Sequence, residues 1–218
     1  MRWTAEAVFW NELAERYARA PLANPDAFER KIAITQACMK ATDVVLDVGC
    51  GTGSLALRLA PRGATIHGLD ISSEMIRIAQ AKARTEGVTN VSLHVGAIDA
   101  CELFEQQSLD GICAYSILHL VEDLPAVLQT LCGWLRPGGF FITSTPCLGE
   151  SWLPYRPIVR VMRWLGKAPY VSVLRKQELE RELGRAGFEG VSEHDVGADS
   201  TIAFIVARKP DVSSARAG

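Results

Sequence analysis

Three glycines stand close together in the run Asp47-Val48-Gly49-Cys50-Gly51-Thr52-Gly53. The run follows a short β-branched segment and precedes a helical pattern, so it predicts a strand-to-helix turn of the kind that binds ligands in open α/β sheets. Glycines let the backbone turn sharply and let a ligand approach its amides. The dinucleotide pattern needs glycine at positions one, three and six, but Ser54 is sixth here and the third glycine is fifth. This departure disfavours a pyrophosphate ligand, and Asp47 can instead accept a hydrogen bond from an ammonium group or water.

A second carboxylate with a chemical use is Asp70, which ends the run TIHGLD, 21 residues after Gly49. At the end of the next strand, a carboxylate can accept both hydroxyls of a ribose. An acid there can also cap the following helix, but Ser72 and Ser73 are available for that role. The loop and Asp70 together predict a ligand of the adenosine type that needs no pyrophosphate.

Three longer runs resemble the successive motifs of a known family. They are VLDVGCGTGSLALRLA (45–60), HGLDISSEMIRIAQAKA (67–83) and LRPGGFF (135–141). They resemble the S-adenosylmethionine-dependent class I methyltransferases, above all the branch related to ubiquinone and menaquinone biosynthesis methyltransferases. The resemblance covers roughly residues 40–145, and residues 186–210 more loosely. It implies methyl transfer from S-adenosylmethionine, which becomes S-adenosylhomocysteine, to a small acceptor, for which a lipophilic molecule is one candidate.

The resemblance also implies which residues contact the cofactor. Asp47, Gly49 and Gly51 would lie beside the methionine moiety, and Asp70 would hold the ribose. The other implied contacts are Ile71, Met75, Ala97 and Ile98 around the adenine, with Tyr115 or Ser116 facing the sulfonium.

The sequence departs from the family after the third predicted strand. Gly-Asp-Ala is common there, whereas this chain has Gly96-Ala97-Ile98-Asp99-Ala100. Two interpretations stay open. Either Asp99 reaches the adenine amino group, or Ile98 packs on the ring and backbone groups recognise it.

The acceptor is expected near the ends of the fourth and fifth strands and the N-terminal helices. Aligning it with an activated methyl group supplies most of the rate, and a base is needed only where the acceptor carries a proton. The candidate residues are Tyr17, Tyr115, His119, Cys147 and Tyr155, of which the first three are candidates for catalysis. For His119 the alternative is a structural histidine bonded to a backbone group, and for Cys147 it is a pocket wall rather than a reactive thiol.

The segment 152–169 has the most distinctive residue pattern of the chain. An apolar stripe at helical spacing consists of Ile158, Val161, Met162 and Leu165. A basic stripe consists of Arg156, Arg160, Arg163 and Lys167, and aromatic area comes from Trp152, Tyr155 and Trp164. Three interpretations are open: a surface helix packed on the sheet, a lid over the acceptor, or a helix on an anionic membrane surface. We favour the lid, because the segment follows the fifth strand.

The elements that position these residues alternate regularly. Strands are predicted at 44–48, 65–70, 91–95, 109–116 and 138–146, with helices between them and two helices, 5–19 and 28–39, ahead. Parallel strands need crossover helices, so the pattern predicts an α/β, Rossmann-like, doubly wound, mostly parallel sheet of seven strands with helices on both faces. After a helix at 176–186, strands at 187–197 and 200–210 form an antiparallel C-terminal hairpin.

Four regions are expected along the chain. Residues 1–42 form N-terminal helices that cover the substrate side, and residues 43–209 form the cofactor-binding domain. A lid-like insertion occupies 150–170 of that domain, and 210–218 form a flexible tail.

Composition limits the alternatives. The 218 residues carry a net charge of −2 and are 48% hydrophobic, which is ordinary globular usage. Near-neutral charge disfavours nucleic-acid binding, which uses a basic face. The six cysteines lack the spacing of a metal or redox site, so no metal is expected, and Cys113 and Cys132 fit as buried apolar residues. Without a signal-peptide core or an apolar run of about 20 residues, a soluble cytoplasmic protein is expected.

Two rival functions stay open at this point. One is an NAD-binding oxidoreductase, which Ser54 at the sixth loop position disfavours. The other is a noncatalytic cofactor-binding or regulatory module of the same fold. The sequence does not determine the acceptor, whether O, N, S or C is methylated, or the oligomeric state.

Overall fold

The computed structural model describes residues 5–101, 103–153, 155, 157, 159 and 169–211. Within these residues lies a seven-stranded sheet in the order β3-β2-β1-β4-β5-β7-β6. The strands are β1 (Val44–Val48), β2 (Thr65–Asp70), β3 (Val91–Val95), β4 (Leu109–Tyr115), β5 (Leu135–Pro146), β6 (Glu189–Glu193) and β7 (Ile202–Arg208). β1 to β5 are parallel, whereas β7 is antiparallel to β5 and to β6. The predicted fold class is confirmed.

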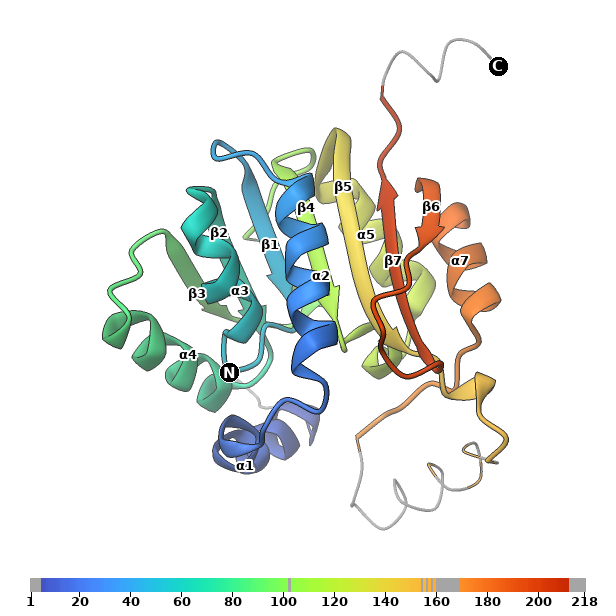
Figure 1. Ribbon diagram of the computed structural model, residues 1–218, viewed down its shortest axis with the longest axis horizontal. Helices are drawn as coiled ribbons and strands as arrows, with labels where there is room; N and C mark the ends of the chain where they lie inside the picture. The colour runs from blue at the N-terminus through green and yellow to red at the C-terminus, as the bar shows by residue number, and fades with distance from the viewer. Residues whose placement is uncertain are drawn as a thin grey trace.

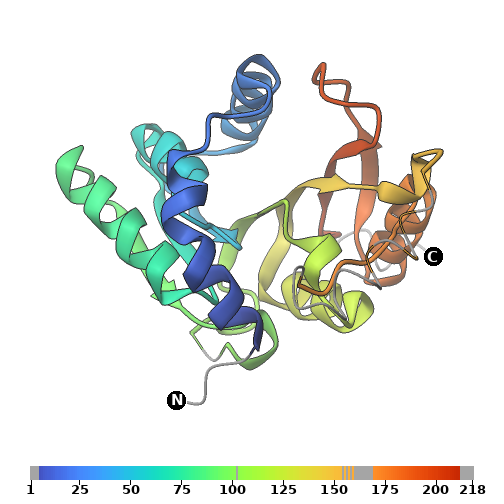
Figure 2. The same cartoon turned by 90° about the horizontal axis from the view of Figure 1, so that it is seen from below.

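Helices cover both faces of the sheet (Figure 1). The α-helices are α1 (Ala5–Arg19), α2 (Pro25–Cys38), α3 (Ser54–Leu59), α4 (Ser73–Thr85), α5 (Leu124–Trp134) and α7 (Lys176–Arg185). Short 3-10 helices are η1 (Ala60–Arg62), η2 (Ile98–Ala100), η3 (Leu118–Leu120) and η4 (Leu148–Glu150). α2, α3 and α4 lie on one face, and α5 and α7 on the other. α1 lies beside α4 at the edge where the parallel strands end (Figure 2).

Both faces of the sheet are buried under apolar layers. Successive residues of β1 point to opposite sides, so Val45 packs with Ile142 in one core, and Leu46 packs with Phe141 in the other. All four are fully buried. Double burial explains why the strands read as almost continuous apolar runs. The packed sheet gives the strand ends, where the chemistry-bearing residues stand, a rigid base.

Helix starts follow the local signals of the sequence. Asn24 accepts a hydrogen bond from the Ala27 amide at 2.9 Å, and Pro25 begins α2. Ser72 caps α4 by accepting from the Met75 amide at 3.1 Å. The predicted serine cap is therefore confirmed, and α2 begins at Pro25 rather than at residue 28.

Several sequence predictions have other bounds or fall outside the described residues. β6 is shorter than the predicted strand 187–197, and β5 begins at Leu135 rather than at residue 138. Most of the segment 152–169, with both of its stripes, lies outside the described residues, and so does 212–218. The lid, the membrane contact and the flexible tail stay predictions. Among the described helices, none has the length and apolar character needed to cross a bilayer.

Candidate functional site

A cavity of about 880 Å³ lies at the carboxyl ends of β1, β2 and β4. This volume is at the upper end of the roughly 300–1,000 Å³ that is usual for small-molecule sites, so it suits a cofactor together with an acceptor. Nine of the ten predicted cofactor contacts line it: Gly49, Gly51, Asp70, Ile71, Met75, Ala97, Ile98, Tyr115 and Ser116. The tenth, Asp47, is not in the lining and is 1% exposed.

The glycine loop forms the floor of the cavity between β1 and α3. Gly49 has a φ of +66°, and a Cβ there would lie 2.8 Å from the Cβ of Ile117. Gly51 has a φ of +52°, but the nearest atom to its Cβ position is Cε1 of Tyr17, at 3.8 Å. Gly49 is therefore required for packing, whereas Gly51 keeps the cavity floor open.

Asp70 joins the glycine loop to the start of α4. Its Oδ2 accepts from the Gly51 amide at 2.8 Å, and its Oδ1 accepts from the Ser72 amide at 2.8 Å. Burial raises the pKa of Asp70, and these two hydrogen bonds oppose that rise. A carboxylate offers about four acceptor positions, so about two stay available for ribose hydroxyls.

Asp47 lies beneath the loop in β1 as a buried acid. Burial raises its pKa from 3.8 to about 8, the charge of Asp70 adds to the rise, and a hydrogen bond from the Ala56 amide opposes it. Oδ2 of Asp47 is buried and has no hydrogen-bond partner in the described part of the chain. A buried oxygen of this kind fits a ligand group or a bound water that completes its hydrogen bonding.

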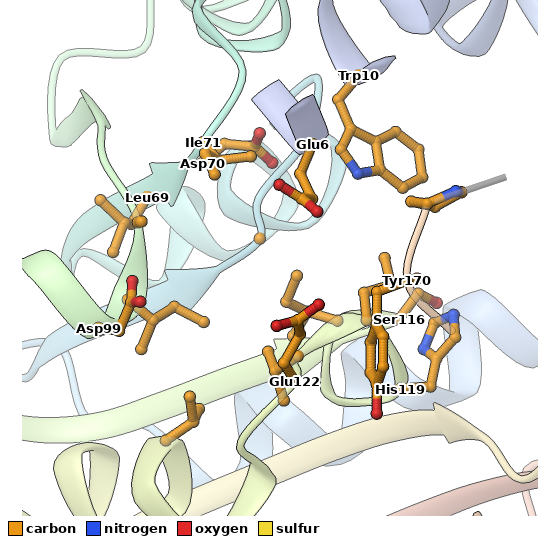
Figure 3. A pocket seen from close by; sticks show the side chains of 18 of the residues that line it. Glu6, Trp10, Leu69, Asp70, Ile71, Asp99, Ser116, His119, Glu122 and Tyr170 are labelled. Atoms are coloured by element: carbon orange, nitrogen blue, oxygen red, sulfur yellow. The ribbon is translucent and has the colours of Figure 1, made fainter. Parts of the chain in front are cut away.

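The opposite end of the predicted cofactor site is built from the residues after β3. Ala97, Ile98 and Asp99 line the cavity, and Ile98 also packs against the apolar core. Figure 3 shows Asp99 at the same end of the cavity as Leu69, across from the labelled acceptor-side residues. Asp99 and Ile98 thus both line this end of the cavity, and the two interpretations of this run stay open.

His119 lies in η3 on the other side of the cavity. Its Nδ1 is buried and has no partner among the described residues, so the structural alternative, a bond to a backbone group, is not made by this nitrogen. Burial lowers the pKa of His119 from 6.5 to about 4, and the ring is neutral at pH 7. A neutral imidazole can accept a hydrogen bond or a proton from an acceptor.

The two candidate tyrosines differ in what holds their hydroxyl groups. The Tyr115 hydroxyl bonds with Oγ1 of Thr35 at 2.8 Å and donates to the Lys31 carbonyl at 3.3 Å, so it anchors α2. The Tyr17 ring lies over Gly51, and its pKa is raised by burial and by the charges of Asp70 and Asp47. Tyr17 therefore stays protonated at neutral pH and is a poor candidate for a base.

Cys147 and Tyr155, also candidates for the acceptor side, do not line the cavity. Cys147 is fully buried, and burial raises the pKa of its thiol to about 11. Such a thiol is unreactive at neutral pH. Ser116 does line the cavity and holds a φ of +55°, a strained conformation for a residue with a side chain.

The described lining residues of the cavity carry negative charge. Its carboxylates are those of Glu6, Asp70, Asp99, Glu122 and Asp123, and no Lys or Arg is among the described lining residues. A site of this charge favours cationic ligands over phosphates. Within the described residues, no group of three or more His, Cys, Asp or Glu side chains is arranged to hold a metal ion.

Comparison with known proteins assigns this site to a family. The model of a family described as a methyltransferase domain matches residues 39–187. The chain belongs to this family. The match includes the glycine loop, Asp70 and His119 but begins after α1 and α2, and it confirms the family resemblance of the three sequence runs.

Curated relatives of this methyltransferase domain include ubiquinone biosynthesis O-methyltransferases. The Rhizobium etli protein is 33% identical over 150 residues, which cover 66% of this chain and 59% of the relative. The Methylobacterium nodulans protein is 38% identical over 101 residues, covering 46% of this chain and 40% of the relative. The chain thus spans about 59% of the length of the first of these relatives.

Solved structures share the fold of this methyltransferase domain. Phosphoethanolamine N-methyltransferase 2 of Haemonchus contortus, in complex with S-adenosyl-L-methionine, has a TM-score of 0.72 and 18% identity, covering 95% of this chain and 58% of that one. A SAM-dependent methyltransferase of Methanosarcina mazei has a TM-score of 0.64 and 24% identity, covering 82% and 97%.

Sequence reasoning missed several residues of the cavity. Glu6 and Trp10 reach it from α1, and Glu122 and Tyr170 from the opposite side (Figure 3). Glu6, Trp10 and Tyr17 recur at spacings of four and seven residues, which places them on one face of α1. This spacing was the available signal, but it did not show which part of the sheet that face would meet.

Proposed function

We propose that this chain transfers a methyl group from S-adenosylmethionine to a small-molecule acceptor. The observation that carries the proposal is the arrangement of Gly51 and Asp70 in the floor of a large acidic cavity. Membership of a methyltransferase family supports it, and so do relatives whose names state O-methyl transfer.

The residues present fit this cofactor. Gly51 leaves space above the loop, Asp70 has acceptor positions for two hydroxyls, and Asp47 has a buried oxygen without a partner. S-adenosylmethionine carries positive charge on its sulfonium and its ammonium group, which suits an acidic cavity. When bound, it supplies a methyl group that is already activated for transfer.

The protein's own part in the reaction is to orient the methyl acceptor and to remove its proton. Trp10 and Tyr17 cover the cavity from α1 and limit the access of water. His119 is our candidate to accept the acceptor's proton, because its ring is neutral and partly unpartnered. A methyl-acceptor molecule with an O–H or N–H group would give up this hydrogen to the imidazole, while the lone pair on its oxygen or nitrogen attacks the methyl carbon.

Calorimetric titration with S-adenosylmethionine, S-adenosylhomocysteine and NAD tests the cofactor. We expect binding of the first two and none of NAD, whereas binding of NAD alone would contradict the proposal. Turnover against a panel of small phenols, thiols and amines then tests the activity. Cofactor binding without turnover of any acceptor would favour the noncatalytic alternative.

A further inference from the structure

Helix α1 packs on α4 through a stripe of small side chains. Ala7, Asn11, Ala14 and Ala18 recur at spacings of four, three and four residues, so they face one way. Ala14 and Ala18 pack in one cluster with Met75 and Ile78 of α4, and Trp10 packs against the same cluster. An alanine methyl group buries little apolar area, so the stripe alone specifies the register of α1 poorly.

Asn11 is the polar member of this stripe, and it contacts the first turn of α4. Its Oδ1 accepts from the Ser72 hydroxyl at 2.7 Å and from the Glu74 amide at 3.2 Å, and lies 3.5 Å from the Ser73 hydroxyl. Amides at a helix N-terminus lack partners within the helix, and the positive end of the helix dipole favours an acceptor there. The bonds therefore join two elements about 60 residues apart along the chain.

The turn that Asn11 contacts is also the turn that Asp70 begins. The Ser72 amide donates to Asp70, while the Ser72 hydroxyl caps α4 and donates to Asn11. One residue, Ser72, thus links the ribose-binding carboxylate of the proposed cofactor site to the helix above it. The other ties between α1 and α4 include the ion pair of Arg77 with Glu15, which is exposed and contributes little.

We propose that Asn11 is a positioning residue that sets the register of α1 on α4 and so holds Trp10 and Tyr17 over the bound cofactor. The inference rests on the proposed cofactor. Both aromatic side chains line the cavity from α1, and a shift of one residue would turn them away from it. A single Asn in an apolar helix seam specifies register in coiled coils at some cost in stability, and the same physics applies here.

The test compares Asn11→Ala with Asn11→Asp, because Asp keeps an acceptor oxygen at the start of α4 and Ala does not. We expect Asn11→Ala to release labelled S-adenosylmethionine about tenfold faster, with a nearly unchanged association rate. Asn11→Asp is expected to restore slow release. An Asn11→Ala protein that melts at a lower temperature but releases the cofactor at the wild-type rate would overturn the inference.

Gln36→Ala is the matched control. The Gln36 side chain donates to the Arg58 carbonyl at 2.9 Å and ties α2 to α3 through one exposed bond, away from the cavity. Its loss should leave cofactor release unchanged. An Asn11→Asp protein as fast as Asn11→Ala would also overturn the inference, because the acceptor oxygen would then not be what holds α1.

Failure of the inference can be told from failure of the proposed function. A wild-type protein that binds neither S-adenosylmethionine nor S-adenosylhomocysteine contradicts the proposed function. If Asn11→Ala does not fold, hydrogen exchange on the wild type gives the answer. Cofactor should slow exchange of the Glu74 amide and of α1 more than that of α2, and equal slowing in both helices would overturn the role of Asn11.

Discussion

The two walls of the cavity are built in different ways. In the wall formed by the glycine loop and the start of α4, polar groups are tied to neighbouring backbone: Asp70 binds two amides, and Ser72 caps a helix. The second wall consists of α1 and η3, which face each other across the cavity. There, His119 keeps a buried nitrogen that has no partner among the described residues, and Tyr17 is 54% exposed. The first wall is preorganised and the second can adapt. A shared cofactor and a variable acceptor would require that division.

The extent of the family match separates α1 from the rest of the cavity. It begins at residue 39, so the preorganised wall and η3 lie inside it and α1 lies outside. α1 is held on α4 by alanines, by the larger Trp10 side chain, by exposed ion pairs that contribute little, and by the Asn11 bonds. Changes in the first wall should therefore damage folding and cofactor binding. In the second wall, changes at His119 should affect mainly turnover, and loosening of α1 should affect mainly the release of the cofactor.

The largest effect is expected for Gly49→Ala in the preorganised wall. A Cβ there meets Ile117 at 2.8 Å, and the left-handed backbone adds strain, so the two terms together should cost about 2–5 kcal/mol of unfolding free energy. Urea unfolding measures this loss. Gly87→Ala isolates the backbone term, because Gly87 has a φ of +68° and no atom within 4 Å of its Cβ position. Equal losses of unfolding free energy in both variants would show that the contact with Ile117 adds nothing to the backbone strain.

The next effect is expected for Asp70→Ala. Loss of hydrogen bonds to a charged group should weaken S-adenosylmethionine binding by up to about a hundredfold. Asp110→Ala is the control, since Asp110 also accepts two bonds, from the Val44 amide and Arg136, away from the cavity lining. It should lose stability but keep cofactor affinity. An unchanged dissociation constant in folded Asp70→Ala would contradict the ribose assignment.

The same division explains what could be predicted from the sequence. The loop and Asp70 could be predicted because strand, turn and helix follow one another in the chain, and parallel strands end at the same edge of a sheet. The contribution of Trp10 could not, because it depends on how α1 docks on α4. Tyr115 was correctly placed at the end of a strand, but its hydroxyl bonds Thr35, 80 residues away, which no local pattern reveals.

His119→Ala tests the adaptable wall. We expect kcat to fall about thirtyfold, less than the roughly 10²–10⁴ of a well-tuned base, because a pKa of about 4 makes the ring a weak base. Cofactor affinity should stay near that of the wild type. His194→Ala, a change at an exposed histidine outside the cavity lining, should leave both quantities unchanged. Full turnover in His119→Ala would contradict its role as a base. It would show that aligning the acceptor with the methyl group is sufficient.

The smallest expected effect is a pH dependence of the unfolding free energy, which has opposite signs for one group in each wall. Asp47 has its pKa raised from 3.8 to about 8, so the folded state holds an extra proton and its stability falls as pH rises between these values. His119 has its pKa lowered from 6.5 to about 4, so its contribution is lost as pH falls through that window. Between pH 4 and 6.5 the two nearly cancel, and from 6.5 to 8 the Asp47 effect should leave a net loss of about 1 kcal/mol.

Two variants resolve this cancellation in urea unfolding across pH 4 to 8. Asp47→Asn leaves the histidine effect alone, so stability should rise up to pH 6.5 and then level off. His119→Gln leaves the aspartate effect alone, so stability should fall continuously from pH 4 to 8. The profiles must diverge in opposite directions, because one group keeps a proton on folding and the other gives one up. Parallel profiles would mean that burial does not raise the pKa of Asp47 and lower that of His119, as the structure requires.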